Sequence, residues 1–264
     1  MTNTLTLDIE REIKRLQTPQ IVELDQVRSL HTWLDNQRIS RQPGRILGES
    51  RTGKTCGIKS YLMEHPPQQV SGVVPQVPVV VVQVPQDCGA KQLYTLIIEA
   101  LQFRITKGTI LDLRQRVYQL LNDCQVQMLV IDEADRIKSK IFADVRDIYD
   151  KLNIAVILVG TERLNAVINR DEQVKNRFLA YFQMGVLNSV QFEQTVAIWE
   201  RDILRLPVPS NLTNKSILKL LREKTRGYIG ILDMILRQAA IVALRKGNFK
   251  IDLETLKEVM AGYG

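Results

Sequence analysis

Residues 48–56 have the types and spacing that hold phosphate groups. They match the pattern G-x-x-x-x-G-K-[ST] at every fixed position and read Gly48-Glu49-Ser50-Arg51-Thr52-Gly53-Lys54-Thr55, with Cys56 next. Glycines let successive N–H groups face phosphate oxygens, and a helix that begins there points its positive end the same way. Lys54 adds a positive charge, and the Thr55 hydroxyl is a hard oxygen ligand for Mg²⁺. All these residues are predicted to bind a nucleoside triphosphate; the alternative is an ordinary glycine turn.

A second motif supplies acidic groups and reads Met128-Leu-Val-Ile-Asp-Glu-Ala-Asp135. Its apolar run predicts a buried strand with Asp132 at the carboxyl end, where open α/β sheets bind ligands. Asp132 would hold Mg²⁺ through water, and Glu133 would polarise an attacking water. The pair predicts nucleotide hydrolysis, and the alternative is an acidic turn after a core strand.

Three further side chains are candidates for contact with the terminal phosphate. Thr161 follows the next predicted strand and would sense that phosphate; it also suits the N-cap of the helix after it, and the two roles are compatible. Arg177, or as second choice Arg170, would reach the nucleotide of a neighbouring subunit and stabilise transferring charge in trans. A solvated helix face explains either arginine equally well.

The elements that must position these residues alternate along the chain. Strands are predicted at 45–47, 77–84, 128–131 and 154–159, with helices at 54–63, 89–103, 109–122 and 142–151 between them. This order predicts an α/β fold, a parallel sheet flanked by helices with right-handed crossovers. After a helical stretch at 162–178 and an edge strand at 181–186, only helices are predicted. We therefore expect a helical lead-in over 1–42, an α/β nucleotide-binding domain over 43–188 and a small all-helical domain over 189–264.

Composition narrows the class of protein. Hydrophobic residues make up 45% and charged residues 25% of the 264 residues, a balance typical of soluble globular proteins. No apolar run approaches the roughly 20 residues of a membrane-spanning helix, and acidic residues near the N-terminus do not suit a signal peptide. Three cysteines and two histidines make a zinc site very unfavourable. We expect a cytoplasmic protein with no membrane partner, and the net charge of +7 is typical of proteins that meet phosphate backbones.

The order and spacing of these motifs resemble an AAA+ P-loop ATPase core followed by a helical lid. The segments GESRTGKT, VIDEAD, FADVRDI, VGTERL, RDEQVKNRF and GYIG more narrowly resemble the TnsC/TniB family, the AAA+ regulators of Tn7-like transposition. The short form is most similar to TnsC of CRISPR-associated transposons. The resemblance implies an ATP-dependent and Mg²⁺-dependent homo-oligomer, a helical filament or ring on double-stranded DNA. It also implies a bridge between a target-selection protein and a transposase, with ATP hydrolysis driving disassembly.

The resemblance also suggests where DNA would lie, because the duplex in such assemblies faces elements inserted around the second strand. The candidates here are Lys91 and the loop that contains Arg104, Lys107 and Thr109. Contacts from these residues to phosphates would give affinity without sequence readout. For each cation alone, a solvated surface charge is the simpler explanation.

Two other functions share the core motifs. One is an initiator or helicase-loader ATPase, although such proteins usually append a DNA-binding or partner domain. The other is a nucleotide-gated switch that assembles on protein partners without DNA. Stimulation of the ATPase by DNA distinguishes the switch from the transposition regulator.

Overall fold

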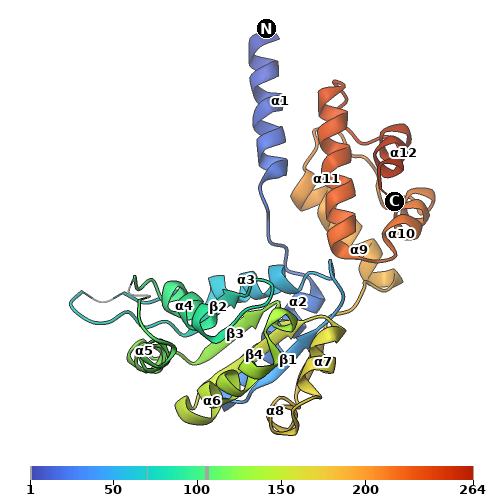
Figure 1. The fold of residues 1–264 in the computed structure, drawn as a ribbon. Coiled ribbons are helices and arrows are strands. Elements are labelled where there is room, and N and C mark those ends of the chain that lie inside the picture. The colour runs from blue at the N-terminus through green and yellow to red at the C-terminus, as the bar shows by residue number, and fades with distance from the viewer. Residues whose placement is uncertain (1, 70, 105–106, 264) are drawn as a thin grey trace. The chain divides into compact units, whose positions relative to one another are not determined.

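Five parallel strands form the sheet of the computed structural model, which describes residues 2–69, 71–104 and 107–263, with side chains from residue 9 onward (Figure 1). The spatial order is β2-β3-β4-β1-β5. The strands are β1 (Gly44–Leu47), β2 (Val79–Gln83), β3 (Met128–Asp132), β4 (Ala155–Gly160) and β5 (Tyr181–Gln183). Every neighbouring pair is parallel, which confirms the predicted α/β fold and the edge position of the last strand.

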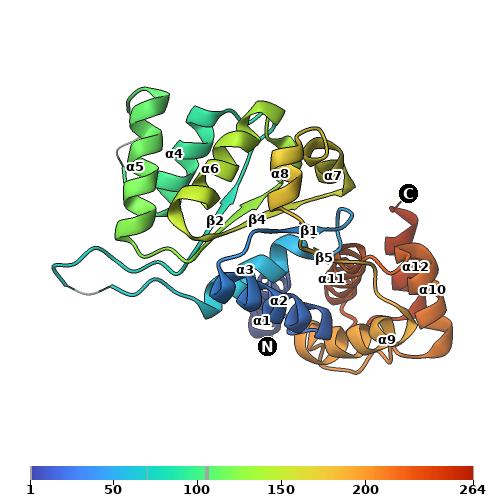
Figure 2. The same cartoon turned by 90° about the horizontal axis from the view of Figure 1, so that it is seen from below.

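Helices cover both faces of the sheet, α2 and α3 on one side and α4 to α8 on the other (Figure 2). Their bounds are α2 (Asp25–Ser40), α3 (Lys54–Glu64), α4 (Ala90–Ala100), α5 (Ile110–Asp123), α6 (Phe142–Leu152), α7 (Glu162–Ile168) and α8 (Glu172–Arg177). The stretch predicted as helical over 162–178 is thus two helices. Asp171 separates them because its side chain caps α8, accepting hydrogen bonds from the backbone N–H groups of Gln173 and Val174.

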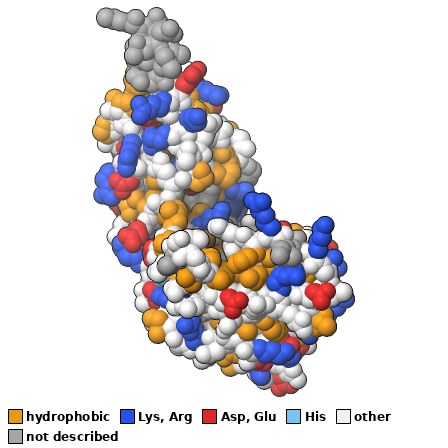
Figure 3. Space-filling view, turned by 90° about the vertical axis from the view of Figure 1, so that its left-hand side faces the viewer, with side chains coloured by type: hydrophobic (Ala, Val, Ile, Leu, Met, Phe, Trp, Pro, Cys, Tyr) orange, Lys and Arg blue, Asp and Glu red, His pale blue; other side chains and the backbone are white. Residues whose placement is uncertain are grey.

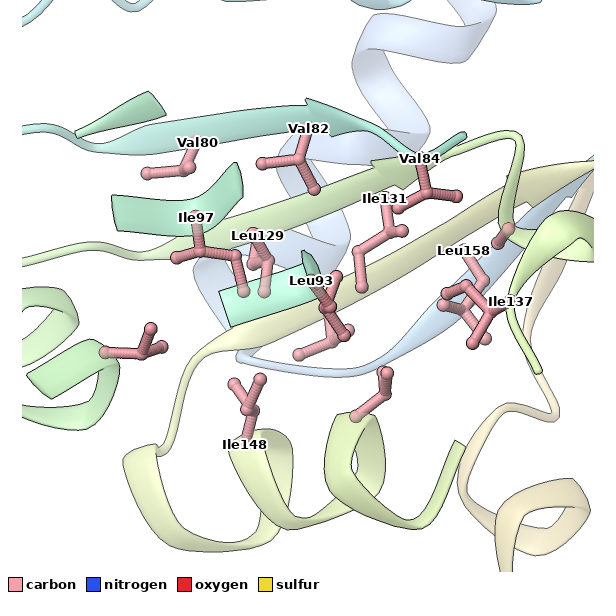
Figure 4. Close-up of a cluster of buried hydrophobic side chains, with 14 of the residues drawn as sticks. Val80, Val82, Val84, Leu93, Ile97, Leu129, Ile131, Ile137, Ile148 and Leu158 are labelled. Atoms are coloured by element: carbon pink, nitrogen blue, oxygen red, sulfur yellow. The ribbon is translucent and has the colours of Figure 1, made fainter. Parts of the chain in front are cut away.

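Each central strand sends alternate side chains into two separate cores. In β3, Leu129 and Ile131 join the core under α4 and α6 (Figure 4), whereas Met128 and Val130 join the core under α2 and α3. All five residues of β3 are buried. Burial on both faces explains why these strands are continuous apolar runs rather than alternating ones.

A polar network fixes α2 against α3, the helix that follows the phosphate-binding loop. The Tyr61 hydroxyl donates to Asp35 Oδ1 at 2.8 Å and accepts from Arg38 Nε at 2.9 Å. Burial and the bond to Asp35 raise the pKa of Tyr61. On the same interface, His31 Nε2 lies 3.0 Å from the carbonyl oxygen of Gly57, the fourth residue of α3. These hydrogen bonds therefore fix α3 against α2.

The chain divides into two compact units, and the division differs from the predicted domains at the N-terminus. One unit contains Asp25–Met184; the other combines the residues up to Leu24 with Gly185 onward. The lead-in predicted over 1–42 is thus split, because α2 buries Leu30 and Leu34 in the sheet's core. Helix α1 (Thr2–Gln17) instead packs on α11 (Ile229–Arg245). The second division, after Met184, lies close to the predicted boundary at 188.

The second unit contains, besides α1 and α11, the helices α9 (Ser189–Ile198), α10 (Lys215–Thr225) and α12 (Leu253–Ala261), with a π-helical turn, η3, at Trp199–Leu204. Arg237 of α11 donates to Asp233 and to the carbonyl oxygen of Leu16, each at 2.7 Å. The bond from Arg237 to Leu16 holds the end of α1 against α11, although the two residues are far apart in the sequence. None of the helices in the described ranges has the length and apolar character to cross a membrane.

Candidate nucleotide-binding site

The loop between β1 and α3 has the tight backbone that its sequence predicts. A Cβ atom on Gly48 would lie 2.3 Å from the carbonyl oxygen of Met184, so only glycine fits there without displacing the backbone. Gly53 has a φ of 95° and Arg51 a φ of 68°, both in the left-handed region. The buried Thr52 hydroxyl donates to the carbonyl oxygen of Glu49 at 2.8 Å. The loop is therefore shaped by its own residues and by the chain after β5.

Lys54 lies over this loop at the start of α3. Its ammonium group donates to the carbonyl oxygens of Gly48 at 2.7 Å and Glu49 at 2.8 Å. Burial lowers the pKa of Lys54, while the carboxylate of Asp132 and its neighbours act in the opposite direction. Phosphate oxygens carry charge and are stronger acceptors than carbonyl groups, so an incoming phosphate would draw the ammonium away from the loop.

The two predicted Mg²⁺ ligands are in direct contact. The Thr55 hydroxyl donates to Asp132 Oδ2 at 2.8 Å, and Asp132 Oδ1 accepts from the backbone N–H of Glu133 at 2.9 Å. Asp132 is only 3% exposed. A hydroxyl and a carboxylate are oxygen donors of the kind Mg²⁺ takes, with phosphates and waters completing its shell. Within the described residues no cluster of three or more acidic, histidine or cysteine side chains forms a full metal cage. The donor set fits Mg²⁺ bound together with a nucleotide.

Glu133 has a strained backbone beside these ligands. Its φ of 59° is unusual for a residue other than glycine, asparagine or aspartate, and such strain concentrates at functional sites. Its Oε2 lies 3.4 Å from Nη2 of Arg136, and both side chains are partly exposed. The acid predicted to polarise water is thus presented at the surface next to a cation.

A cleft of about 600 Å³ lies at this edge of the sheet. It is lined by Glu49, Ser50, Gln86, Glu133, Asp135, Arg136, Thr161, Glu162 and Arg163. The predicted residues Glu49, Ser50, Glu133 and Thr161 therefore share one cavity. Lys54, Thr55, Asp132 and the other predicted residues of the loop are not among its lining residues, and Arg51 and Cys56 are exposed. Five further residues line the cleft without having been predicted from the sequence: Gln86, Asp135, Arg136, Glu162 and Arg163. Each follows the carboxyl end of β2, β3 or β4, and that shared position is the signal that would have found them.

Thr161 has the helix-capping role and also a cleft position. Its side chain accepts from the backbone N–H of Arg163 at 3.4 Å and so caps α7. Its hydroxyl donates to Asp135 Oδ2 at 3.2 Å. The cap is a property of the fold, and contact with a phosphate stays a prediction.

Neither candidate arginine lines the cleft of its own subunit. Arg177, at the end of α8, is exposed, and its Nε and Nη2 lie 3.3 and 3.4 Å from the Asp150 carboxylate of α6. Arg170 is exposed in the turn between α7 and α8. Contact of either arginine with the nucleotide of a neighbouring subunit stays a prediction.

The predicted DNA-contacting residues follow β2: Lys91 lies in the first turn of α4, and the others lie between α4 and α5. Lys91, Arg104 and Lys107 are exposed, while Ile105 and Thr106 of the predicted loop lie outside the described residues. Thr109 caps α5, because its hydroxyl oxygen accepts from the backbone N–H of Asp112 at 3.2 Å. In return, its hydroxyl and its backbone N–H each donate to Asp112 Oδ2 at 2.8 Å. Both donors of Thr109, its hydroxyl and its backbone N–H, are thus occupied by a carboxylate of its own helix.

A parallel sheet with a phosphate-binding loop after β1, an acidic pair after β3 and a polar residue after β4 defines a P-loop ATPase of the AAA+ class. The family model described as bacterial TniB protein matches residues 7–184. The chain belongs to the TniB family, and it is an ATPase.

Solved structures share this fold at low sequence identity. The ORC2 protein of Aeropyrum pernix, in ADPNP and ADP complexes, has a TM-score of 0.68 and 14% identity over 93% of this chain and 70% of its own. Cdc6p from Pyrobaculum aerophilum has a TM-score of 0.72 and 16% identity over 95% and 70%. The ORC1 protein of Aeropyrum pernix in complex with DNA has a TM-score of 0.65 and 17% identity over 94% and 68%. No curated protein matches the sequence.

We predict that Gly48→Ala abolishes the thermal stabilisation that ATP with Mg²⁺ gives the wild-type protein. The added methyl would have to displace the Met184 backbone from 2.3 Å, which distorts the phosphate-binding loop; overpacking of this kind costs about 1–3 kcal/mol. Thermal unfolding with and without nucleotide measures both effects.

Gly89→Ala is the matched control, because nothing lies within 4 Å of a Cβ there. Its nucleotide-dependent shift should equal that of the wild type. A Gly48→Ala protein that is stabilised by nucleotide as strongly as the control would contradict the assignment of this loop.

Proposed function

We propose that this TniB-family chain is an ATP-gated oligomer that binds double-stranded DNA without sequence preference, as a helical filament or ring. It regulates transposition by marking the target site and by bridging a target-selection protein to the transposase. ATP hydrolysis drives its disassembly. The observation that carries the proposal is a backbone connection between the nucleotide-binding cleft and the start of α4, which bears Lys91.

That connection runs through Cys88, which is fully buried. Its backbone N–H donates to the carbonyl oxygen of Arg136 at 3.1 Å, and its carbonyl oxygen accepts from the N–H of Lys138 at 3.1 Å. Arg136 in turn contacts Glu133, and Gln86, two residues before Cys88, lines the cleft. A change in the turn after Glu133 therefore moves the residue that precedes Gly89, the N-cap of α4.

The hydrolysis assigns one task to each residue of the site. Lys54 and the loop N–H groups bind the phosphates of the substrate, ATP. Mg²⁺, held by Thr55 and through water by Asp132, would supply positive charge that compensates the developing negative charge. As the oxygen of a water forms a bond to the γ-phosphorus, Glu133 accepts a proton from that water and the bond to the β–γ bridging oxygen breaks. ADP and phosphate leave.

Oligomerisation completes the site in this proposal. Arg177, or Arg170 as second choice, would approach the γ-phosphate bound by an adjacent subunit, because neither lines the cleft of its own subunit. Arg177 would exchange its long contact with Asp150 for a charge-assisted bond to phosphate. Arg104, Lys107 and Lys91 would contact DNA phosphates, with Thr109 at the edge of this group. On the face shown in Figure 3, Lys and Arg lie interspersed with Asp and Glu.

One observation favours a nucleotide-gated switch on protein partners as the second candidate. Asp112 places a carboxylate beside Thr109, and the next residues, Ile110 and Leu111, are 52% and 53% exposed. Negative charge and apolar surface suit a protein partner better than a phosphate backbone. An initiator-type ATPase shares the fold, but the family match over residues 7–184 supports transposition.

We predict opposite effects for two substitutions in the nucleotide site. Lys54→Ala should weaken ATP binding by about 10- to 100-fold, because a charge-assisted hydrogen bond contributes about 1.5–3 kcal/mol, and should abolish assembly on DNA. Glu133→Gln should keep ATP binding, lose hydrolysis and leave the protein trapped on DNA. Co-sedimentation with duplex DNA in the presence of ATP measures assembly, and phosphate release measures hydrolysis.

If Glu133→Gln hydrolyses ATP at the wild-type rate, Glu133 does not accept the proton of the attacking water. Lys140→Ala is the control, because Lys140 is an exposed lysine after the same acidic motif and does not line the cleft. It should behave as wild type in both assays.

A separate prediction concerns the DNA-binding lysines. Replacing Lys91 or Lys107 with alanine should make the negative slope of log affinity against log salt concentration shallower by about 1 for each DNA phosphate that the variant no longer neutralises. The change should be the same for all DNA sequences. Fluorescence anisotropy with labelled duplexes at several salt concentrations measures the slope. The lysines are chosen because replacing Thr109 would also uncap α5.

Lys59→Ala, an exposed lysine on α3, should leave the slope unchanged. Slopes equal to wild type for both test variants, with DNA still bound, would show that the duplex lies elsewhere. A wild-type protein that binds no DNA while its ATPase works would favour the protein-partner switch.

A further inference from the structure

Asp135, the last residue of the acidic motif, has no task in the proposed hydrolysis. It lies in the short 3-10 helix η1 (Ala134–Arg136), directly after Glu133, and lines the same cleft. Its Oδ2 accepts the hydroxyl proton of Thr161 at 3.2 Å. Its Oδ1 is buried and has no hydrogen-bond partner among the described residues. A buried carboxyl oxygen without a partner indicates a role beyond the stability of the turn.

The end of β4 is shaped to admit this carboxylate. A Cβ atom on Gly160 would lie 2.7 Å from Asp135 Oδ1, closer than side-chain atoms approach one another. Gly160 therefore lets Asp135 reach the neighbouring Thr161. The contact joins the turn after β3 to the turn after β4, the two segments that carry the candidate acid and the candidate sensor.

We propose that Asp135 is a positioning residue that turns the Thr161 hydroxyl into a hydrogen-bond acceptor toward the cleft. A hydroxyl has one proton and two lone pairs, and a carboxylate can only accept. Because the proton of Thr161 is donated to Asp135, its oxygen can receive hydrogen bonds but cannot give one. It already accepts from the N–H of Arg163, at the long distance of 3.4 Å.

The direction of this hydroxyl decides whether Thr161 can contact a phosphate oxygen or a water molecule. Phosphate oxygens are acceptors and gain nothing from another acceptor, whereas a water molecule can donate. Thr161 would therefore hold one proton of the attacking water while Glu133 takes the other. This inference rests on the proposed hydrolysis, and it replaces the predicted contact of Thr161 with the terminal phosphate by a contact with water.

A double-mutant cycle tests whether Asp135 acts through Thr161. Asp135→Ala should lower kcat by about 10- to 100-fold, the range expected when a side chain that orients a reacting group is removed, with the Kd of ATP within about threefold of wild type. Asp135→Asn should recover most of the rate, because its amide oxygen can still accept from Thr161. In a Thr161→Val background, Asp135→Ala should change kcat by less than about threefold.

A binding measurement gives an answer that does not depend on hydrolysis. Titration with fluorescent ATP and ADP analogues yields the ratio of their Kd values. Thr161→Val should keep the wild-type ratio, because this substitution removes no bond to the γ-phosphate. Glu162→Ala is the matched control for charge: it removes a carboxylate from the same cleft, one whose bonds go to Asn165 and Gln183.

Three results would overturn the inference. One is a loss of preference for ATP over ADP in Thr161→Val, which would restore the phosphate contact. Another is a result in which Asp135→Ala lowers kcat by the same factor in the wild-type protein and in the Thr161→Val variant. The third is a loss of kcat in Glu162→Ala as large as that in Asp135→Ala, which would assign the effect to the removal of a negative charge alone. A wild-type protein without hydrolysis would instead overturn the proposed function, and this control is measured first.

Discussion

The hydrogen bond between Thr55 and Asp132 joins two motifs that lie 77 residues apart in the chain, and the site depends on it. The bond is possible because β4 lies between β1 and β3 and pairs in parallel with both, which brings their carboxyl ends to one edge. Two apolar cores fix that sheet, and α2 supports α3 from behind through Tyr61 and His31. The polar atoms at the edge are thus placed by two apolar cores and by one polar network between α2 and α3.

Local patterns in the sequence were enough to predict the phosphate-binding loop and the buried strand that ends at Asp132. Gly48 and Gly53 are required by the backbone of the loop itself, and the continuous apolar run before Asp132 reports burial of β3 on both faces. The place of α1 was not predictable, because it depends on Arg237 reaching the carbonyl oxygen of Leu16 across more than 200 residues. The bond from Thr161 to Asp135 also needs three dimensions, since it requires the space left by Gly160. The capping box of Thr109 and Asp112, by contrast, can be read from the sequence, and it accounts for a residue that the resemblance had assigned to DNA.

The turn after β3 links the separate functions of the molecule. Its backbone at Arg136 and Lys138 holds Cys88 just before α4, and its side chains Glu133 and Asp135 face the nucleotide cleft. The cleft and the start of α4, which bears Lys91, are therefore connected through a few backbone hydrogen bonds. This arrangement gives a physical route by which ATP could control DNA binding, with Asp135 setting the direction of the Thr161 hydroxyl on the same turn.

The most direct test of ATP-gated assembly is electron microscopy of the wild-type protein with linear duplex DNA in ATP, in ADP and without nucleotide. We expect ordered filaments or rings along the DNA with ATP, and bare DNA in the other two conditions. Bare DNA in all three conditions, with ATP hydrolysis intact, would contradict it and would favour assembly on a protein partner instead.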